Sequence, residues 1–252
     1  ETLRDPRISL PMYGQIADLQ DNGQFVPYDP YRLTDNCQQT ILSYMAEPPK
    51  QESGHNLWLI LIAGRQSGKS VTSEYGAYAK AAYTFGYDHV CMADSRKRAE
   101  FLHRRVHNLH DKWPENVRQE TLYTNEIRQL SFANRAMMRV IYAKDGSAGI
   151  GQSFDSFHWS EVPFCDGAAD TWSMLQPAIV NRKNTSVLME STPAPQHISS
   201  ASWWQDIAFQ AYRRESRFIL AFFSFWDTLS NRRRWPDNAK IEAHELKLLE
   251  EF

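Results

Sequence analysis

The segment from Gly64 to Ser70, with the sequence GRQSGKS, combines the residue types that bind phosphate groups. Backbone N–H groups of a glycine-rich turn and of the following helix N-terminus supply positive potential at close range. Gly68 has no Cβ and lets the backbone approach the phosphates, Lys69 can reach the β- and γ-phosphates, and the Ser70 hydroxyl can bind Mg²⁺. Only the first glycine of the consensus is missing, because Ala63 takes its place. The segment predicts a binding site for ATP with Mg²⁺.

The flanking residues have the pattern needed to position such a loop. Residues 57–63 are continuously apolar, as expected of a strand buried on both faces of a parallel sheet. Residues 71–82 contain four alanines and no proline, which predicts a helix. A buried strand, a tight turn and a helix start therefore follow one another, as the phosphate-binding chemistry requires.

Hydrolysis also needs an acidic residue that activates water, and such residues stand at the ends of buried strands. Glu161 follows the expected strand of residues 154–159 and is the candidate base. The preceding residue is Ser160, where ATPases usually have aspartate, and a serine can hold a magnesium-bound water only weakly. Asp155 is too far back along an extended chain to replace it.

A second group of hydroxyls follows the short strand expected at residues 186–189. Glu190, Ser191, Thr192 and Pro193 come directly after it. The hydroxyls could sense the γ-phosphate and relay its loss, and on spacing alone a simple Ser/Thr-Pro turn is the better interpretation.

Composition narrows the class of protein. The chain has 252 residues, 42% of them hydrophobic, and a net charge of −2, which argues against a general polyanion binder. No apolar run approaches the length of a membrane span. Cys37, Cys91 and Cys165 are far apart, show no metal-type spacing and fit a reducing cytosol.

The remaining chain predicts alternating strands and helices. Residues 1–30 are rich in Pro, Asp and Gly and are expected to form an extended arm. We expect helices near residues 34–44, 96–112 and 171–177, and further strands at 89–93, 126–132 and 137–142, with a glycine-containing loop at 144–152. This order favours an α/β fold with a mostly parallel sheet and right-handed crossovers.

Together the motifs resemble one family, the large terminase subunit of tailed bacteriophages. The resemblance covers about residues 25–235 and rests on four motifs in order: the NCQQTIL segment at 36–42, the loop at 64–70, Ser160-Glu161, and Ser191-Thr192-Pro193. It implies a three-layer P-loop NTPase domain of the RecA/ASCE type at residues 31–235, with residues 236–252 beginning a linker or lid. It also implies an ATPase with no nuclease domain within these residues.

The resemblance also assigns roles. Gln38 would contact adenine, Arg65 would lie near the γ-phosphate, and Glu161 would activate water. Lys69 would hold phosphates and would be catalytic together with Glu161 and Arg65. The other nucleotide-binding positions would be Gly64, Gln66, Ser67, Gly68 and Ser70. Magnesium would be held by Ser70 and, through water, by Ser160, while Ser191 and Thr192 would couple hydrolysis to movement.

Many terminases add an arginine that acts in the neighbouring subunit. Its matching position here is Ile150, so Lys144, Arg139 or Arg135 would have to serve instead. Hydrolysis is then expected at subunit interfaces of a homo-oligomeric ring, expected to be a pentamer, although the isolated domain could be monomeric.

The resemblance implies partners and a place of action. These are double-stranded DNA, the phage portal protein and the small terminase subunit, in the host cytoplasm. Four basic clusters could contact DNA phosphates: Arg96 to Arg98, Arg104-Arg105, Arg213-Arg214 and Arg232 to Arg234. Two alternatives remain: a helicase-like DNA translocase, and a regulatory module that binds nucleotide without turnover.

Overall fold

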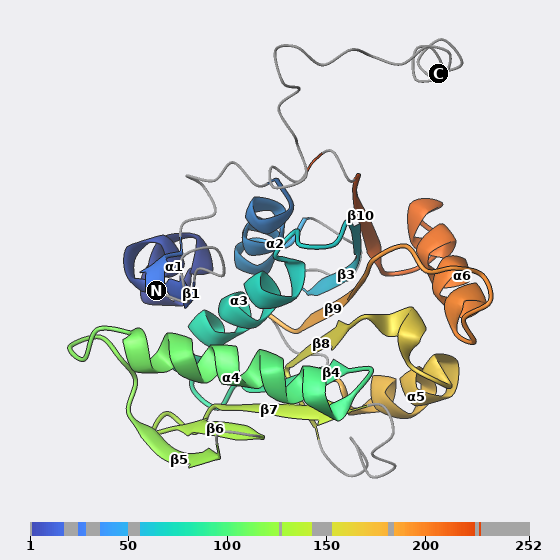
Figure 1. Ribbon diagram of the computed structural model, residues 1–252. Helices are drawn as coiled ribbons and strands as arrows, with labels where there is room; N and C mark the ends of the chain where they lie inside the picture. The colour runs from blue at the N-terminus through green and yellow to red at the C-terminus, as the bar shows by residue number, and fades with distance from the viewer. Residues whose placement is uncertain are drawn as a thin grey trace, which may run out of the picture.

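The computed structural model describes residues 2–17, 25–28, 36–49, 56–125, 128–142, 153–180, 184–224 and 227. Its centre is an eight-stranded sheet, which has six parallel strands and a two-strand antiparallel extension (Figure 1). In spatial order the strands are β10 (Ile219–Phe223), β3 (Leu57–Ala63), β9 (Ser186–Ser191), β8 (Ser156–Ser160), β4 (Asp88–Ala93), β7 (Met137–Tyr142), β6 (Gln129–Phe132) and β5 (Thr121–Asn125). This confirms the expected α/β fold with a mostly parallel central sheet.

Helices cover both faces of the sheet and give the domain three layers (Figure 1). One face carries α1 (Pro6–Tyr13), α2 (Asn36–Ala46), α3 (Lys69–Tyr83) and α4 (Arg96–Lys112). The other carries α5 (Ala168–Leu175) and α6 (Ala201–Tyr212). The smaller elements are the 3-10 helices Thr2–Arg4, Val162–Phe164 and Gln176–Ala178, and a separate antiparallel pair, β1 (Gln15–Ala17) and β2 (Phe25–Pro27).

Strand β3 explains why both faces are covered. Its side chains alternate between two hydrophobic cores, so Leu57, Leu59 and Leu61 pack toward α1–α4 while Trp58 and Ile60 pack toward α5 and α6. All five are buried. Strand β3 is therefore held in place by a hydrophobic core on each face of the sheet. The phosphate loop begins at the carboxyl end of this strand.

The expected extended arm at residues 1–30 is wrong for residues 6–13, which form helix α1. Asp5 accepts a hydrogen bond from the Arg7 backbone N–H at 2.9 Å, and Pro6 occupies the first helical position, where its missing N–H costs nothing. Leu10 is fully buried among α2 and α3. The local cap and the packing of Leu10 and Tyr13 against the core outweigh the Pro- and Gly-rich composition.

Strands β5 and β10 and helix α6 lie outside the elements that the sequence indicated. Strand β10 is a parallel edge strand paired with β3, and α6 packs behind it. Among the described residues, no helix combines the length and the apolar character that crossing a bilayer requires.

A buried histidine on α4 makes stability dependent on pH. Burial, and then the charge of Arg118, lower the pKa of His110 from 6.5 to about 4. Its Nδ1 lies 3.1 Å from the Tyr78 hydroxyl. Because the unfolded chain binds this proton more readily, stability should fall as the pH drops from 6.5 toward 4. Allowing for solvent screening, we expect a loss of about 2 kcal/mol.

Urea unfolding at pH 7 and pH 4.5 checks this expectation. The variant His110→Gln should lose less stability between the two pH values than the wild-type chain. The matched control is His197→Gln, because His197 is exposed. Equal losses in all three proteins would show that His110 is not the group that titrates.

Candidate nucleotide site

The loop from residue 64 to residue 68 connects β3 to α3 and borders a cavity of about 480 Å³. Gly68 adopts a left-handed conformation, with φ of 73°, and a Cβ there would lie 2.3 Å from Gln38 Nε2. Only glycine fits this position without strain. The cavity is lined by most of the residues that the sequence indicated: Arg65, Gln66, Ser67, Gly68, Lys69, Ser70, Glu161 and Thr192.

Lys69 is buried at the start of α3 and faces two carboxylates. Its Nζ lies 3.7 Å from Glu161 Oε1 and 3.6 Å from Glu190 Oε2. The next residue, Ser70, donates a hydrogen bond from its hydroxyl to Glu190 Oε1 at 2.6 Å. An ammonium and a hydroxyl from consecutive residues therefore line the cavity, as the binding of nucleotide phosphates requires.

Glu161 directly follows β8, as the sequence predicted, and has a left-handed backbone with φ of 57°. A non-glycine residue in this region is uncommon and is often held for a functional reason. Its Oε2 accepts a hydrogen bond from the Ser191 hydroxyl at 3.0 Å and lies 3.4 Å from the Thr192 backbone N. The carboxylate is thus held in the lining of the cavity, where it could orient a water.

Glu190 is the residue of this site that the sequence reasoning did not assign. It belongs to β9, which is longer than expected and includes Glu190 and Ser191. The side chain is completely buried. Burial alone would raise the pKa of Glu190, but the charges of Lys69 and His158 outweigh it and lower the pKa to about 2. A buried, ionised carboxylate therefore touches Ser70.

A network of ion pairs and hydrogen bonds extends from Glu190 into the core between α3 and the sheet. His158 Nε2 lies 3.6 Å from Glu190 Oε1, and His158 Nδ1 lies 2.6 Å from Glu74 Oε1. His89 Nε2 also contacts Glu74 Oε1, at 3.1 Å. Burial would lower the pKa of His158, but Glu190 and Glu74 outweigh it and raise the pKa to about 9. Protonated His158 therefore links the two buried carboxylates.

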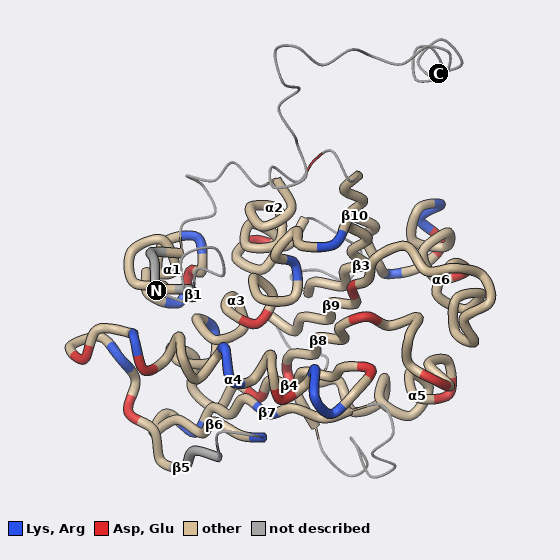
Figure 2. The backbone as a smooth tube through the Cα atoms, viewed as in Figure 1, with Lys and Arg blue, Asp and Glu red and all other residues tan. Residues whose placement is uncertain are grey.

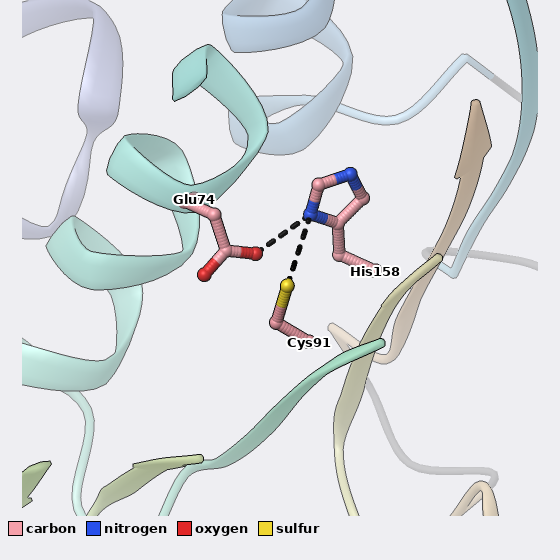
Figure 3. Close-up of side chains that lie close together, drawn as sticks. All are labelled: Glu74, Cys91 and His158. Atoms are coloured by element: carbon pink, nitrogen blue, oxygen red, sulfur yellow. Dashed lines mark hydrogen bonds and ion pairs between the residues drawn. The ribbon is translucent and has the colours of Figure 1, made fainter. Parts of the chain in front are cut away.

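Glu74, Cys91 and His158 converge from α3, β4 and β8 and offer ligand types that zinc accepts (Figure 3). Their ligand atoms lie within 4.8 Å of one another. His158 Nδ1, however, is already engaged with Glu74 at 2.6 Å, and burial raises the pKa of the Cys91 thiol. The three residues are better explained as a hydrogen-bonded support for the site than as a metal centre.

Comparison with solved structures identifies the architecture. The HK97 bacteriophage large terminase matches with a TM-score of 0.62 at 15% identity, over 97% of this chain and 47% of that one. The large terminase of a thermophilic bacteriophage matches with a TM-score of 0.56 at 13% identity, over 78% and 47%. The fold is that of phage large terminases.

The matching structures include an isolated terminase ATPase domain. The large terminase ATPase domain of Thermus phage P74-26, in a mutant form, matches with a TM-score of 0.55 at 17% identity, over 73% of this chain and 84% of that one. The terminase of the thermophilic bacteriophage has also been solved with ADP, and this complex matches with a TM-score of 0.55 at 11% identity, over 86% and 49%. The chain thus spans about half the length of the full terminases. No family model and no curated protein sequence matches it.

The roles that the terminase resemblance gives to Gln38 and Arg65 are not tested by the structure. Gln38 on α2 places its Nε2 3.4 Å from the Ser67 carbonyl, so it supports the loop from behind. Arg65 is exposed at the rim of the cavity. Contact of Gln38 with adenine and of Arg65 with the γ-phosphate therefore stay predictions. Gly64, which begins the loop, is half-buried.

The residues named for action in a neighbouring terminase subunit are differently placed. Arg139 Nη2 pairs with Asp88 Oδ2 at 2.7 Å, and Arg135 lies over the Phe85 ring. Both positions are nearer the amino ends of the parallel strands, whereas the phosphate loop lies at their carboxyl ends. Lys144 and Ile150 lie outside the described residues. A trans-acting basic residue stays a prediction.

Proposed function

We propose that the chain is the ATPase motor domain of a viral large terminase subunit, which uses ATP hydrolysis to move double-stranded DNA into a procapsid. The observation that carries this proposal is the convergence of Lys69, Ser70 and Glu161 on one cavity, with Glu161 tied to Ser191 and Thr192. A phosphate loop alone serves binding, whereas a fixed carboxylate opposite its lysine also serves hydrolysis.

The described residues fit a magnesium ion beside the phosphate loop. Ser70 offers its hydroxyl, and buried Glu190 Oε2 accepts no hydrogen bond from the described residues, although Lys69 lies 3.6 Å away. When bound, Mg²⁺ neutralises charge on the β- and γ-phosphates. Ser160, expected to hold the ion through water, is buried with its hydroxyl 3.4 Å from that of Ser70.

In the proposed reaction, Lys69 holds the γ-phosphate while Glu161 orients a water against its phosphorus. Glu161 accepts a proton from the water as the new P–O bond forms. The bond between the γ-phosphorus and the bridging oxygen breaks, which leaves ADP and phosphate. Because Thr192 Oγ1 lies 3.5 Å from Glu161 Oε2, a shift of the carboxylate on product release would reach the segment after β9. Thr192 is therefore the proposed coupling residue, together with Ser191.

The same proposal includes contact with DNA, assembly with the portal and the small subunit, a ring of five copies, and action in the host cytoplasm. Basic and acidic residues are interspersed over the helices (Figure 2). Within α4, Arg96 pairs with Glu100, while Arg98 pairs with Asp94 just before the helix. Arg104, Arg213 and Arg214 are exposed, Arg105 lies over the Phe101 ring, and Arg232 to Arg234 lie outside the described residues. We expect DNA affinity to be weak in the isolated chain and to grow with assembly.

Phosphate release from ATP with Mg²⁺, with and without duplex DNA, tests the function. Lys69→Ala should weaken nucleotide binding about 10- to 100-fold, because hydrogen bonds to charged groups contribute roughly 1.5–3 kcal/mol. Lys112→Ala is the control, since Lys112 is exposed at the end of α4 and lies outside the four basic clusters that could contact DNA. Binding without turnover under all these conditions would favour the regulatory module. Duplex unwinding would favour the helicase-like alternative.

A further inference from the structure

The residue before Glu161 carries no charge, although ATPases with this site usually place an acid there. Ser160 is buried at the carboxyl end of β8, and its hydroxyl lies 3.4 Å from that of Ser70. A neutral hydroxyl attracts a divalent cation far less than a carboxylate does. The site therefore needs its negative charge from another residue.

The order of the strands provides that residue. Strand β9 lies between β3, which carries the phosphate loop, and β8, which carries Glu161. Ser160 and Glu190 are register partners on β8 and β9, so their side chains lie on the same face of the sheet. A carboxylate at position 190 thus stands one strand away from the usual position of the acid and nearer to the loop.

The contacts of Glu190 match the requirements of a cation site. Its Oε1 accepts the Ser70 hydroxyl hydrogen bond at 2.6 Å, and its Oε2 is buried without a hydrogen bond from the described residues. Lys69 is shared between Glu190 and Glu161, and protonated His158 is shared between Glu190 and Glu74, so each of these two cations faces two carboxylates. A hard divalent cation binds carboxylate and hydroxyl oxygens of this kind.

We propose that Glu190 on β9 supplies the carboxylate that holds Mg²⁺, or its water shell, beside Ser70, in place of the acid usually found at position 160. This inference rests on the proposed function, since it assumes that nucleotide binds with the ion. His158 is the positioning residue, because it contacts Glu190 Oε1 from the core side at 3.6 Å. In this interpretation, the carboxylate that usually stands at position 160 on β8 is replaced by the carboxylate of Glu190 on the neighbouring strand β9.

A purely structural role for Glu190, as the counter-ion of buried Lys69, predicts a different result. Glu161 serves as the matched control, because its carboxylate lies 3.7 Å from Lys69 Nζ and that of Glu190 lies 3.6 Å away. Among the described residues, only Glu190 of these two also contacts Ser70. The variants Glu190→Gln and Glu161→Gln therefore remove the same charge from Lys69, but only the first removes it from the cation position.

The experiment measures the dissociation constant of a fluorescent, non-hydrolysable ATP analogue in Mg²⁺ and in EDTA. Glu190→Gln should reduce the Mg²⁺-dependent gain in affinity about 10- to 100-fold, as loss of a residue supporting a metal does. In Glu161→Gln, the Mg²⁺-dependent gain in affinity should stay within about twofold of the wild-type value, because this variant removes no residue that supports the metal. The affinity for Mn²⁺, measured by electron paramagnetic resonance, should likewise fall in Glu190→Gln and stay near the wild-type value in Glu161→Gln.

Returning the carboxylate to position 160 provides a second test, which remains valid if Glu190→Gln does not fold. Glu190→Ser alone should lose the Mg²⁺-dependent gain, and adding Ser160→Asp to it should restore most of it. Thermal unfolding confirms that each variant is folded. A folded Glu190→Gln with the wild-type gain, or a double variant without one, overturns the inference. A wild-type chain that binds no nucleotide in either condition overturns the proposed function itself.

Discussion

The variant Glu161→Gln should lose ATP turnover by about 10²- to 10⁴-fold while it still binds nucleotide. The amide has nearly the shape of the carboxylate, and its oxygen can still accept the hydrogen bond from Ser191, which is 3.0 Å long in the wild-type chain. Only the negative charge and the basicity are removed. A loss of this size would therefore report proton transfer and not a collapse of the site.

Steady-state phosphate release and equilibrium binding of the same nucleotide separate the two effects. Glu215→Gln is the matched control, because it makes the same chemical change on an exposed loop after α6. Turnover of the Glu161 variant within about threefold of the control would rule out Glu161 as the general base. If nucleotide binding fell together with turnover, the main role of Glu161 would instead be to position Lys69.

Local sequence patterns were sufficient for the loop and for Glu161. A continuously apolar strand, a glycine-rich turn and an alanine-rich helix are consecutive in the chain, so their contacts do not depend on the rest of the fold. Glu161 could be placed because it directly follows a buried strand, and the ends of parallel strands meet at one edge. The structure confirms these placements around one cavity.

Glu190 could not be assigned in the same way, because its role depends on the order of strands. The sequence shows a glutamate after a short apolar run, which is equally compatible with a solvated turn. Only the insertion of β9 between β3 and β8 places it beneath Ser70. The signal that could have found it is the missing acid at Ser160, which required a substitute elsewhere. Helix α1 was missed for a related reason, since the burial of Leu10 against α2 and α3 adds to its local cap.

The second large effect concerns Glu74, whose replacement by alanine should destabilise the fold by about 3–5 kcal/mol. Glu74 is buried and contacts His158 at 2.6 Å and His89 at 3.1 Å. Burial would raise the pKa of Glu74, but the two histidines hold it well below its usual range, so the carboxylate is ionised at neutral pH. Removing it leaves His158 with Glu190 as its one carboxylate partner among the described residues, in a setting where water cannot compensate.

Urea unfolding of three variants distinguishes charge from packing. Glu74→Gln keeps an acceptor for one histidine and should lose only about 1–3 kcal/mol, because the hydrogen bond is partly retained. Glu215→Ala, at an exposed position, should stay within about 0.5 kcal/mol of the wild-type chain. If Glu74→Gln were as stable as the wild-type chain, the ionised carboxylate would contribute nothing beyond its shape. His158 would then not depend on Glu74 for its charge, and its hold on Glu190 would have to come from the strand β8 alone.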